Sequence, residues 1–155
     1  MYKYPKIPII GSEDCKDIFL YDNDIITIEE KVDGGNFSIF LEDNIIHHCT
    51  RNRDLTISLD NQTFGSFRMM LPMILKDKLN LDYIYYMEVM QKHTLTYTTF
   101  PPFIGLDIRV KKDINGGLGL FLPRKAKEKE FERIGIPVIN LIIEKSALFV
   151  TKNYQ

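Results

Sequence analysis

The stretch that decides the fold reads Glu29-Glu30-Lys31-Val32-Asp33-Gly34-Gly35-Asn36-Phe37-Ser38-Ile39-Phe40. It places a lysine behind two glutamates, then a glycine-rich turn, then alternating apolar and polar residues. A lysine at a strand end beside a tight turn can be held with its amine facing a pocket. Burial away from water favours the neutral, nucleophilic form of the amine, and so does the presence of nearby cations. Lys31 is therefore the candidate nucleophile, and Gly34 and Gly35 are expected to adopt positive φ and to admit a ligand close to the backbone.

Length and composition set the limits for this candidate. A chain of 155 residues with 45% hydrophobic residues is long enough for one globular domain with a real core. The net charge of −1 lacks the basic footprint of a dedicated nucleic-acid binder, so any such contact needs a local patch. Two cysteines without metal-ligand spacing predict reduced thiols in the cytoplasm. We expect no secretory signal and no membrane span.

Around the lysine, the pattern predicts strands. Residues 25–31 form one expected strand, and residues 36–42 form the next, with Phe37, Ile39 and Leu41 on one face. Asp43-Asn44 is a turn signal, and residues 45–50 are expected to return as the partner strand. This hairpin is expected to bring Asn36 close to Lys31 and Arg51 back toward the start of the strand.

The rest of the chain predicts a mixed α+β architecture. We expect a helix within residues 64–79 with Pro72 inside it, strands at 83–90 and 103–110, a helix from Pro123 to Ile134 ended by Gly135, and a buried strand at 136–143. Three methionines of the first helix, Met69, Met70 and Met73, are expected in the core. The lysines of the second helix alternate with glutamates, which favours a solvated face over an RNA-binding one.

The lysine stretch resembles a known family. Lys31-Val32-Asp33-Gly34 matches the Lys-x-Asp-Gly signature of covalent nucleotidyltransferases, namely DNA ligases, RNA ligases and mRNA capping enzymes. The run from Glu30 to Ser38 is most similar to the RNA ligase 2 branch, where Glu-Lys-x-x-Gly-x-Asn-Phe surrounds the adenylylated lysine. The resemblance extends from the extended, proline-containing segment at residues 4–11 to about residue 145. It implies a nucleotidyltransferase fold of mainly antiparallel sheets with a few helices.

Three further segments resemble later motifs of that family. Thr50-Arg51 is similar to its Ser-Arg motif, with threonine in place of serine. Glu88 lies where the family carries Gly-Glu in a strand, with methionine before it in place of glycine. Leu106 occupies the position of an aromatic residue that stacks on adenine. Taken alone, Glu88 fits equally well a glutamate that pairs with a lysine or faces water.

The resemblance implies a reaction and a site. Lys31 would form lysyl-AMP from ATP with Mg²⁺, pass AMP to a 5′-phosphate RNA end, and allow a 3′-hydroxyl to seal the strand, as in RNA repair. Nucleotide binding would involve Glu30, Asn36, Arg51, Glu88 and Leu106, with Asn36 holding phosphate or the hydration shell of the metal. No residue is expected to ligate a metal directly.

Two motifs of the family have not appeared by Gln155, an Glu-Gly-x-Val segment and a Lys-x-Lys strand. Residues 1–155 are therefore expected to be a C-terminally truncated nucleotidyltransferase domain without a second domain. An alternative is a non-catalytic nucleotide- or RNA-binding remnant, or the N-terminal piece of a split ligase that needs a second chain. A capping-type guanylyltransferase or a DNA ligase is a third possibility, against which Asn36-Phe37-Ser38 argues.

Overall fold

The structure is a computed structural model that describes residues 2–9, 12–15, 21–56, 63–91, 95–97, 99–112 and 115–153. Its contacts divide the chain into two compact units. The larger unit comprises residues 1–4 and 32–139, and the smaller unit comprises residues 5–31 and 140–155. The expected α+β class with antiparallel sheets is confirmed, and each unit has a sheet of its own.

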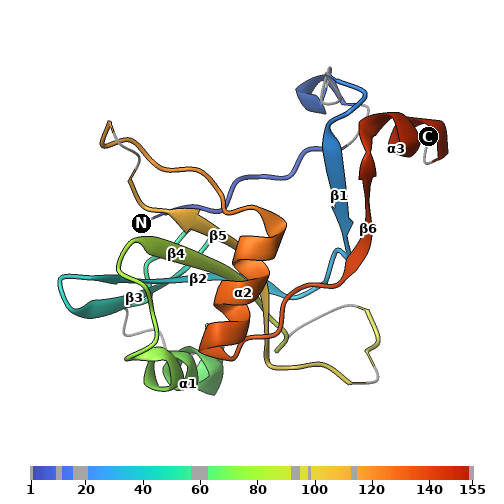
Figure 1. The fold of residues 1–155 in the computed structure, drawn as a ribbon. Helices are drawn as coiled ribbons and strands as arrows, with labels where there is room; N and C mark the ends of the chain where they lie inside the picture. Colours follow the sequence, from blue (N-terminus) through green and yellow to red (C-terminus); the bar gives the residue numbers. More distant parts are fainter. Residues whose placement is uncertain are drawn as a thin grey trace. The chain divides into compact units, whose positions relative to one another are not determined.

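A four-stranded antiparallel sheet forms the larger unit (Figure 1). Its strands are β2 (Gly35–Glu42), β3 (Ile45–Thr50), β4 (Tyr83–Val89) and β5 (Phe103–Val110), in the order β3-β2-β4-β5. The expected hairpin is confirmed, with Phe37 opposite Thr50. Asp43 and Asn44 form its turn with φ of 50° and 61°, left-handed values that Asp and Asn tolerate in hairpin turns.

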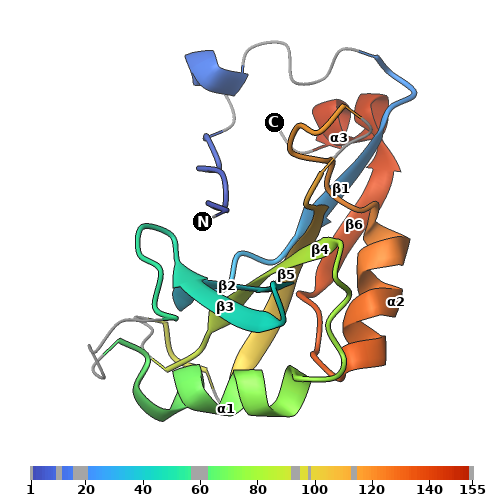
Figure 2. The same ribbon diagram turned by 90° about the vertical axis from the view of Figure 1, so that its left-hand side faces the viewer.

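One face of this sheet carries the main core. Phe37 and Ile39 of β2 and Tyr85 and Met87 of β4 are fully buried there, together with side chains of two helices. The helices are α1 (Gly65–Leu75) and α2 (Arg124–Ile134), drawn beside the sheet in Figure 2. Gly135 ends α2 with a φ of 81°, as the sequence predicted.

The opposite face is covered by aromatic residues. Phe40 of β2 and Tyr86 of β4 are buried in a second cluster, against which Tyr2, Tyr4 and Phe121 pack. Tyr2 meets Phe40 edge-on at 4.9 Å between ring centroids, and Tyr4 lies 5.0 Å from Tyr86. The start of the chain therefore supplies part of the cover of the sheet.

The methionines of α1 correct a prediction. Met69, Met70 and Met73 are 62%, 44% and 80% exposed, not in the core. The helix packs on the sheet with the side that carries Leu71 and Leu75, both fully buried, and the methionines lie elsewhere on its surface. A helix as apolar as α1 does not reveal from composition which side is covered.

β5 corrects the expected alternation. Tyr86 pairs with Asp107 and Met87 with Gly105, so Leu106 is an extra residue in a β-bulge. The bulge shifts the pattern by one. Ile104, Asp107 and Arg109 consequently share the face of Glu88, whereas strict alternation along the strand expected at 103–110 would place Ile104 and Asp107 on opposite faces.

The smaller unit holds a two-stranded antiparallel ribbon of β1 (Ile25–Glu29) and β6 (Leu141–Ser146), a short 3₁₀ turn η1 (Glu13–Cys15) and α3 (Ala147–Asn153). Ser146 accepts a hydrogen bond from the Phe149 N–H at 3.4 Å, as expected for a cap. The expected strand at 136–143 is wrong in position and burial, since β6 begins at Leu141 and is largely exposed. Among the described residues, no helix has the length and apolar character to cross a membrane.

Candidate functional site

Asn36 and Glu88 are brought together by the pairing of β2 with β4. They are direct cross-strand partners, so both side chains extend from the same face of the sheet. Both are half-buried. Glu88 accepts a hydrogen bond at Oε1 from the backbone N–H of Gly34 at 3.0 Å. The glutamate therefore holds the loop that follows the candidate nucleophile.

The two glycines of this loop are required by close packing, which corrects the expectation of positive φ. Neither Gly34 nor Gly35 is among the described glycines with a left-handed backbone. A Cβ on Gly34 would lie 2.6 Å from the carbonyl oxygen of Val89 and 2.9 Å from Cγ of Glu88. A Cβ on Gly35 would lie 2.3 Å from the ring of Phe64. No other residue type fits at either position without movement of a neighbour.

A second clamp on the loop was not foreseen from the sequence. The backbone N–H of Asp33 donates to the hydroxyl of Tyr97 at 2.9 Å, and the carboxylate of Asp33 accepts from the N–H of Leu95 at 3.1 Å. Tyr97 and Leu95 lie between β4 and β5, far from Asp33 in the chain. Only the fold brings these segments together, so no local pattern could have identified the contact.

Glu30 and Lys31 belong to the smaller unit. The Nδ2 group of Asn140 donates to Oε2 of Glu30 at 2.7 Å, and the N–H of Glu30 donates to the carbonyl of Asn140 at 3.0 Å. Lys31 follows β1 and its side chain is exposed. The chain passes from Lys31 directly into Val32, the first residue of this stretch of the larger unit.

Leu106 belongs to an apolar cluster within the larger unit. It packs against a cluster that contains the buried residues Val32, Met90 and Ile139. Its carbonyl accepts a hydrogen bond from Nζ of Lys127 at 2.7 Å. The structure thus places Leu106 against the cluster that includes Val32, the residue that follows Lys31.

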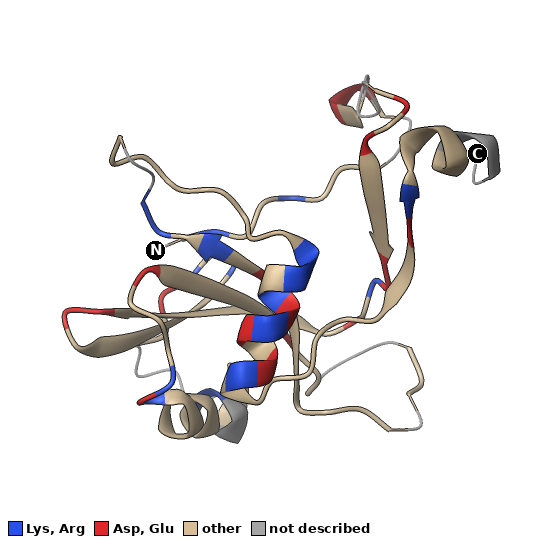
Figure 3. Cartoon of the chain, in the orientation of Figure 1, with Lys and Arg blue, Asp and Glu red and all other residues tan. Residues whose placement is uncertain are grey.

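Lys127 corrects the prediction of a wholly solvated lysine face on α2. Figure 3 shows blue and red residues alternating along this helix, yet Lys127 is only 4% exposed. Its Nζ lies 2.9 Å from Oδ1 of Asp107, and Oδ2 of Asp107 accepts a 2.5 Å hydrogen bond from the hydroxyl of Tyr4. Alternating charges are typical of a solvated helix, and the sequence gives no sign that one lysine points inward.

Arg51 lies at the tip of a turn directly after β3. Oγ1 of Thr50 accepts from the N–H of Arg53 at 3.0 Å, and the N–H of Thr50 donates to the carbonyl of Arg53 at 2.9 Å. Phe37 is opposite Thr50, so the turn lies beside the start of β2, which confirms the expected return of the chain. Arg51 itself is exposed.

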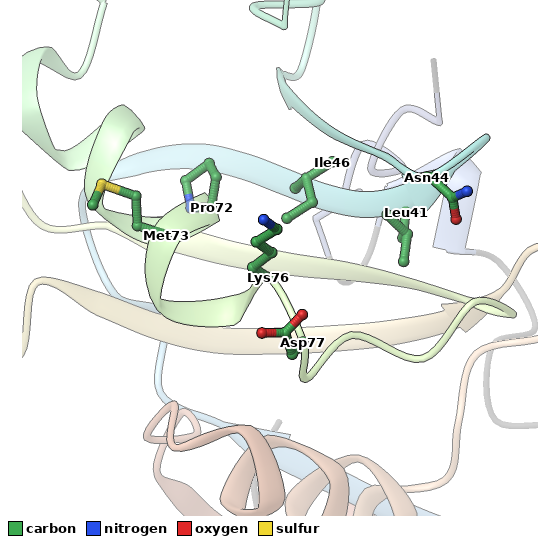
Figure 4. A pocket seen from close by; sticks show the side chains of 7 residues that line it. All are labelled: Leu41, Asn44, Ile46, Pro72, Met73, Lys76 and Asp77. Atoms are coloured by element: carbon green, nitrogen blue, oxygen red, sulfur yellow. The ribbon is translucent and has the colours of Figure 1, made fainter.

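Other chemistry finds little support in the part of the chain that the structure describes. Those residues contain no group of three His, Cys, Asp or Glu side chains that could hold a metal ion. Burial raises the pKa of Cys49 to about 11, so that thiol stays protonated at neutral pH. A hollow of about 540 Å³ lies between α1 and the β2–β3 hairpin (Figure 4). It is lined by Leu41 and Ile46, which share the opposite sheet face from Asn36 and Glu88.

Solved structures of ligases share this fold. An archaeal ATP-dependent RNA ligase superposes with a TM-score of 0.58 at 18% identity, covering 97% of this chain and 39% of its own. A Naegleria gruberi RNA ligase variant solved with ATP and Mn gives 0.58 at 13% identity, covering 84% and 40%. A candidate ATP-dependent DNA ligase from Aquifex aeolicus gives 0.61 at 20% identity, covering 95% and 39%. The chain thus spans about two fifths of the length of these solved chains.

The sequence comparisons are consistent with the fold. No curated protein matches the chain. The sequence profile of the RNA ligase family matches residues 24–152, a range that includes β1, the lysine stretch, the whole four-stranded sheet and β6. The chain therefore belongs to the RNA ligase family.

Proposed function

We propose that this chain is the ATP-dependent adenylylation part of an RNA ligase, with Lys31 as its nucleophile. The amine of Lys31 attacks the α-phosphorus of ATP, a phosphoramide bond forms, and the bond to the leaving pyrophosphate breaks. AMP then passes to a 5′-phosphate RNA end, and a 3′-hydroxyl displaces AMP to seal the strand. The observation that carries the proposal is the hydrogen bond from the Gly34 N–H to Glu88, which ties the lysine loop to the sheet face that carries Asn36 and Glu88.

The proposal gives each candidate residue a role. Asn36 and Glu88 face the ribose and phosphate side of the nucleotide, and Glu30 faces adenine. Leu106 covers the base from the apolar cluster, without the stacking of an aromatic ring. Arg51 is exposed at its turn, where a guanidinium is available to phosphate oxygens. Support comes from the shared sheet face of Asn36 and Glu88 and from the packing of Leu106 near Val32.

Mg²⁺ fits this site as a companion of ATP. The described residues offer isolated oxygens, such as those of Asp33, Asn36 and Glu88, in place of a full ligand set. Mg²⁺ typically keeps several waters and binds through substrate phosphates and one or two carboxylates. When bound, it supplies positive charge that favours transfer of the phosphoryl group. Asn36 would hold a phosphate oxygen or a water of the metal.

Intact mass tests the proposal directly. The protein is incubated with ATP and Mg²⁺, denatured and weighed, beside Lys31→Ala and the control Lys129→Ala on the exposed side of α2. The wild type and the control are expected to gain one AMP, and Lys31→Ala none. A folded wild type that gains nothing refutes activity of this chain alone. A gain of AMP on Lys31→Ala would show that another residue is the nucleophile. A gain of one nucleotide from GTP but not from ATP would favour a capping-type enzyme.

A second candidate is a chain that needs a partner for activity. The β1–β6 ribbon favours it, because Ile25, Leu141 and Ile142 are 66%, 45% and 62% exposed on a two-stranded sheet. Such a ribbon is marginal alone, and further strands would stabilise it. Adenylylation that appears only when a second chain with the Glu-Gly-x-Val and Lys-x-Lys motifs is added would favour this candidate. Binding of ATP or RNA with no adenylylation under either condition would favour a non-catalytic role.

A further inference from the structure

The outer edge of β5 is covered by two segments that leave a gap. At one end, the carbonyl of Gly105 accepts from the N–H of Ile139 at 2.9 Å. At the other end, the carbonyl of Ile108 accepts from the N–H of Leu122 at 2.8 Å. The bulge at Leu106 lies between these two contacts, where neither segment provides a backbone donor to its carbonyl.

Lys127 fills this gap. Its ammonium donates to the carbonyl of Leu106 at 2.7 Å, in the manner of the N–H of a neighbouring strand. Its charge is balanced by Asp107 at 2.9 Å, and Asp107 is held from the other side by Tyr4. A buried lysine is costly unless it is paired and hydrogen-bonded. Lys127 meets both conditions, because it pairs with the carboxylate of Asp107 and donates a hydrogen bond to the carbonyl of Leu106.

The bulge determines where Leu106 lies. As the extra residue of β5, Leu106 has no cross-strand partner on β4 to fix its direction. Its position in the cluster with Val32 and Ile139 therefore depends on how its own backbone is held. The contact with Lys127 is the side-chain hydrogen bond that the structure gives to that backbone.

We propose that Lys127 is a positioning residue for nucleotide binding, which holds the β5 bulge so that Leu106 covers the base. This inference rests on the proposed function, since it needs ATP to bind beside Leu106. Lys127 itself does not touch the nucleotide. Its loss should therefore weaken recognition of the base and leave recognition of the phosphates unchanged.

Calorimetric titration with ATP and with inorganic tripolyphosphate separates these effects. Lys127→Met is expected to raise the Kd for ATP about tenfold, as for loss of one base contact, with the Kd for tripolyphosphate unchanged. Lys129→Met, an exposed lysine on the same helix, should change neither Kd. Unchanged ATP binding by a folded Lys127→Met, or equal weakening for both ligands, overturns the inference.

A double variant separates positioning from stability. Lys127→Met leaves Asp107 without its cation and should lower Tm, whereas Lys127→Met with Asp107→Asn removes the unpaired charge and should recover Tm. The carbonyl of Leu106 still lacks its donor in the double variant, so the Kd for ATP should stay raised. Recovery of ATP affinity along with Tm overturns the positioning role.

Two outcomes distinguish failure of the proposed function from failure of this inference. A wild type that binds tripolyphosphate but not ATP refutes both. ATP binding that is equal in the wild type and the variants refutes this inference alone.

Discussion

The two units differ in how much each buries. In the larger unit, both faces of the sheet are covered, one by α1 and α2 and the other by aromatic side chains. In the smaller unit, apolar residues on β6 and α3 such as Ile142 and Phe149 are 62% and 40% exposed. Burial of apolar surface is the main favourable term in folding. The larger unit is therefore expected to fold by itself, whereas the ribbon buries too little apolar surface to be stable alone. The candidate nucleophile belongs to the weakly buried unit, and most of the candidate nucleotide-binding residues belong to the well-buried one.

The largest expected effect tests this difference with one truncation in each unit. Phe131→Ala in α2 removes a fully buried ring and should cost about 3–5 kcal/mol in the free energy of unfolding. Ile142→Ala in β6 should change it by less than about 0.5 kcal/mol. Urea unfolding monitored by circular dichroism measures both. A large loss of unfolding free energy for Ile142→Ala would show that the ribbon is buried in solution. The two units would then not differ in burial.

The next effect tests whether the loop before β2 in the larger unit is packed as tightly as the sheet. Gly34→Ala places a Cβ 2.6 Å from the backbone oxygen of Val89, which has no side-chain torsion to yield. We expect a loss of about 1–3 kcal/mol, typical of overpacking. Asn36→Ala is the control, because it removes atoms from the same region and should cost less. Equal unfolding midpoints for Gly34→Ala and the wild type would mean that the loop is loose.

A pair of neighbouring tyrosines sharpens the comparison within the larger unit. The Tyr85 hydroxyl donates to Oε1 of Glu130 at 2.6 Å and accepts from the N–H of Asn80 at 2.9 Å. Tyr85→Phe should cost about 1–2 kcal/mol. The buried Tyr86 hydroxyl has no hydrogen-bond partner among the described residues, so Tyr86→Phe should cost nothing or stabilise slightly. Thermal unfolding measures the stability of both variants. A larger loss for Tyr86→Phe than for Tyr85→Phe would refute the hydrogen-bond assignment.

The smallest effect is a change in pH dependence. Burial, followed by the charge of Arg68, lowers the pKa of His48 below its ordinary value of about 6.5, while nearby Asp54 opposes the shift. Because the folded pKa is depressed, His48 contributes stability above the unfolded pKa that is lost as pH falls from about 6.5 through the folded pKa. His48→Gln should flatten this part of the curve of unfolding free energy against pH. An unchanged slope would show that His48 does not titrate differently on folding.

Local patterns predicted the parts of the fold that are set locally. The alternation in residues 36–42 and the Asp43-Asn44 turn determine the β2–β3 hairpin, because pleat and turn chemistry act within a few residues. Pro123 and Gly135 bracket α2 for the same reason. The family resemblance assigned Asn36 and Glu88 to one site, but their pairing across β2 and β4 was not predicted, since it depends on strands far apart in the chain.

Features set by non-local packing were missed. The burial of Lys127 depends on a gap in the edge of β5, and the exposure of Met73 depends on which side of α1 meets the sheet. The bulge at Leu106 depends on pairing with β4. None of these has a local signal, because each arises where two distant segments meet. The roles of Glu30, Asn36, Arg51, Glu88 and Leu106 in binding stay predictions.

The bulge also constrains how the gene for this chain can change. Substitutions along β5 alter one side chain at a time, but loss of a single codon at Leu106 would restore strict pairing with β4. Because side chains alternate with a period of two, that loss would keep Ile104, Asp107 and Arg109 on their shared face and would remove only Leu106 and the carbonyl that Lys127 contacts. A related chain without the bulge is therefore expected to keep the faces of β5 and to lack the packing of Leu106 against the cluster of Val32, Met90 and Ile139.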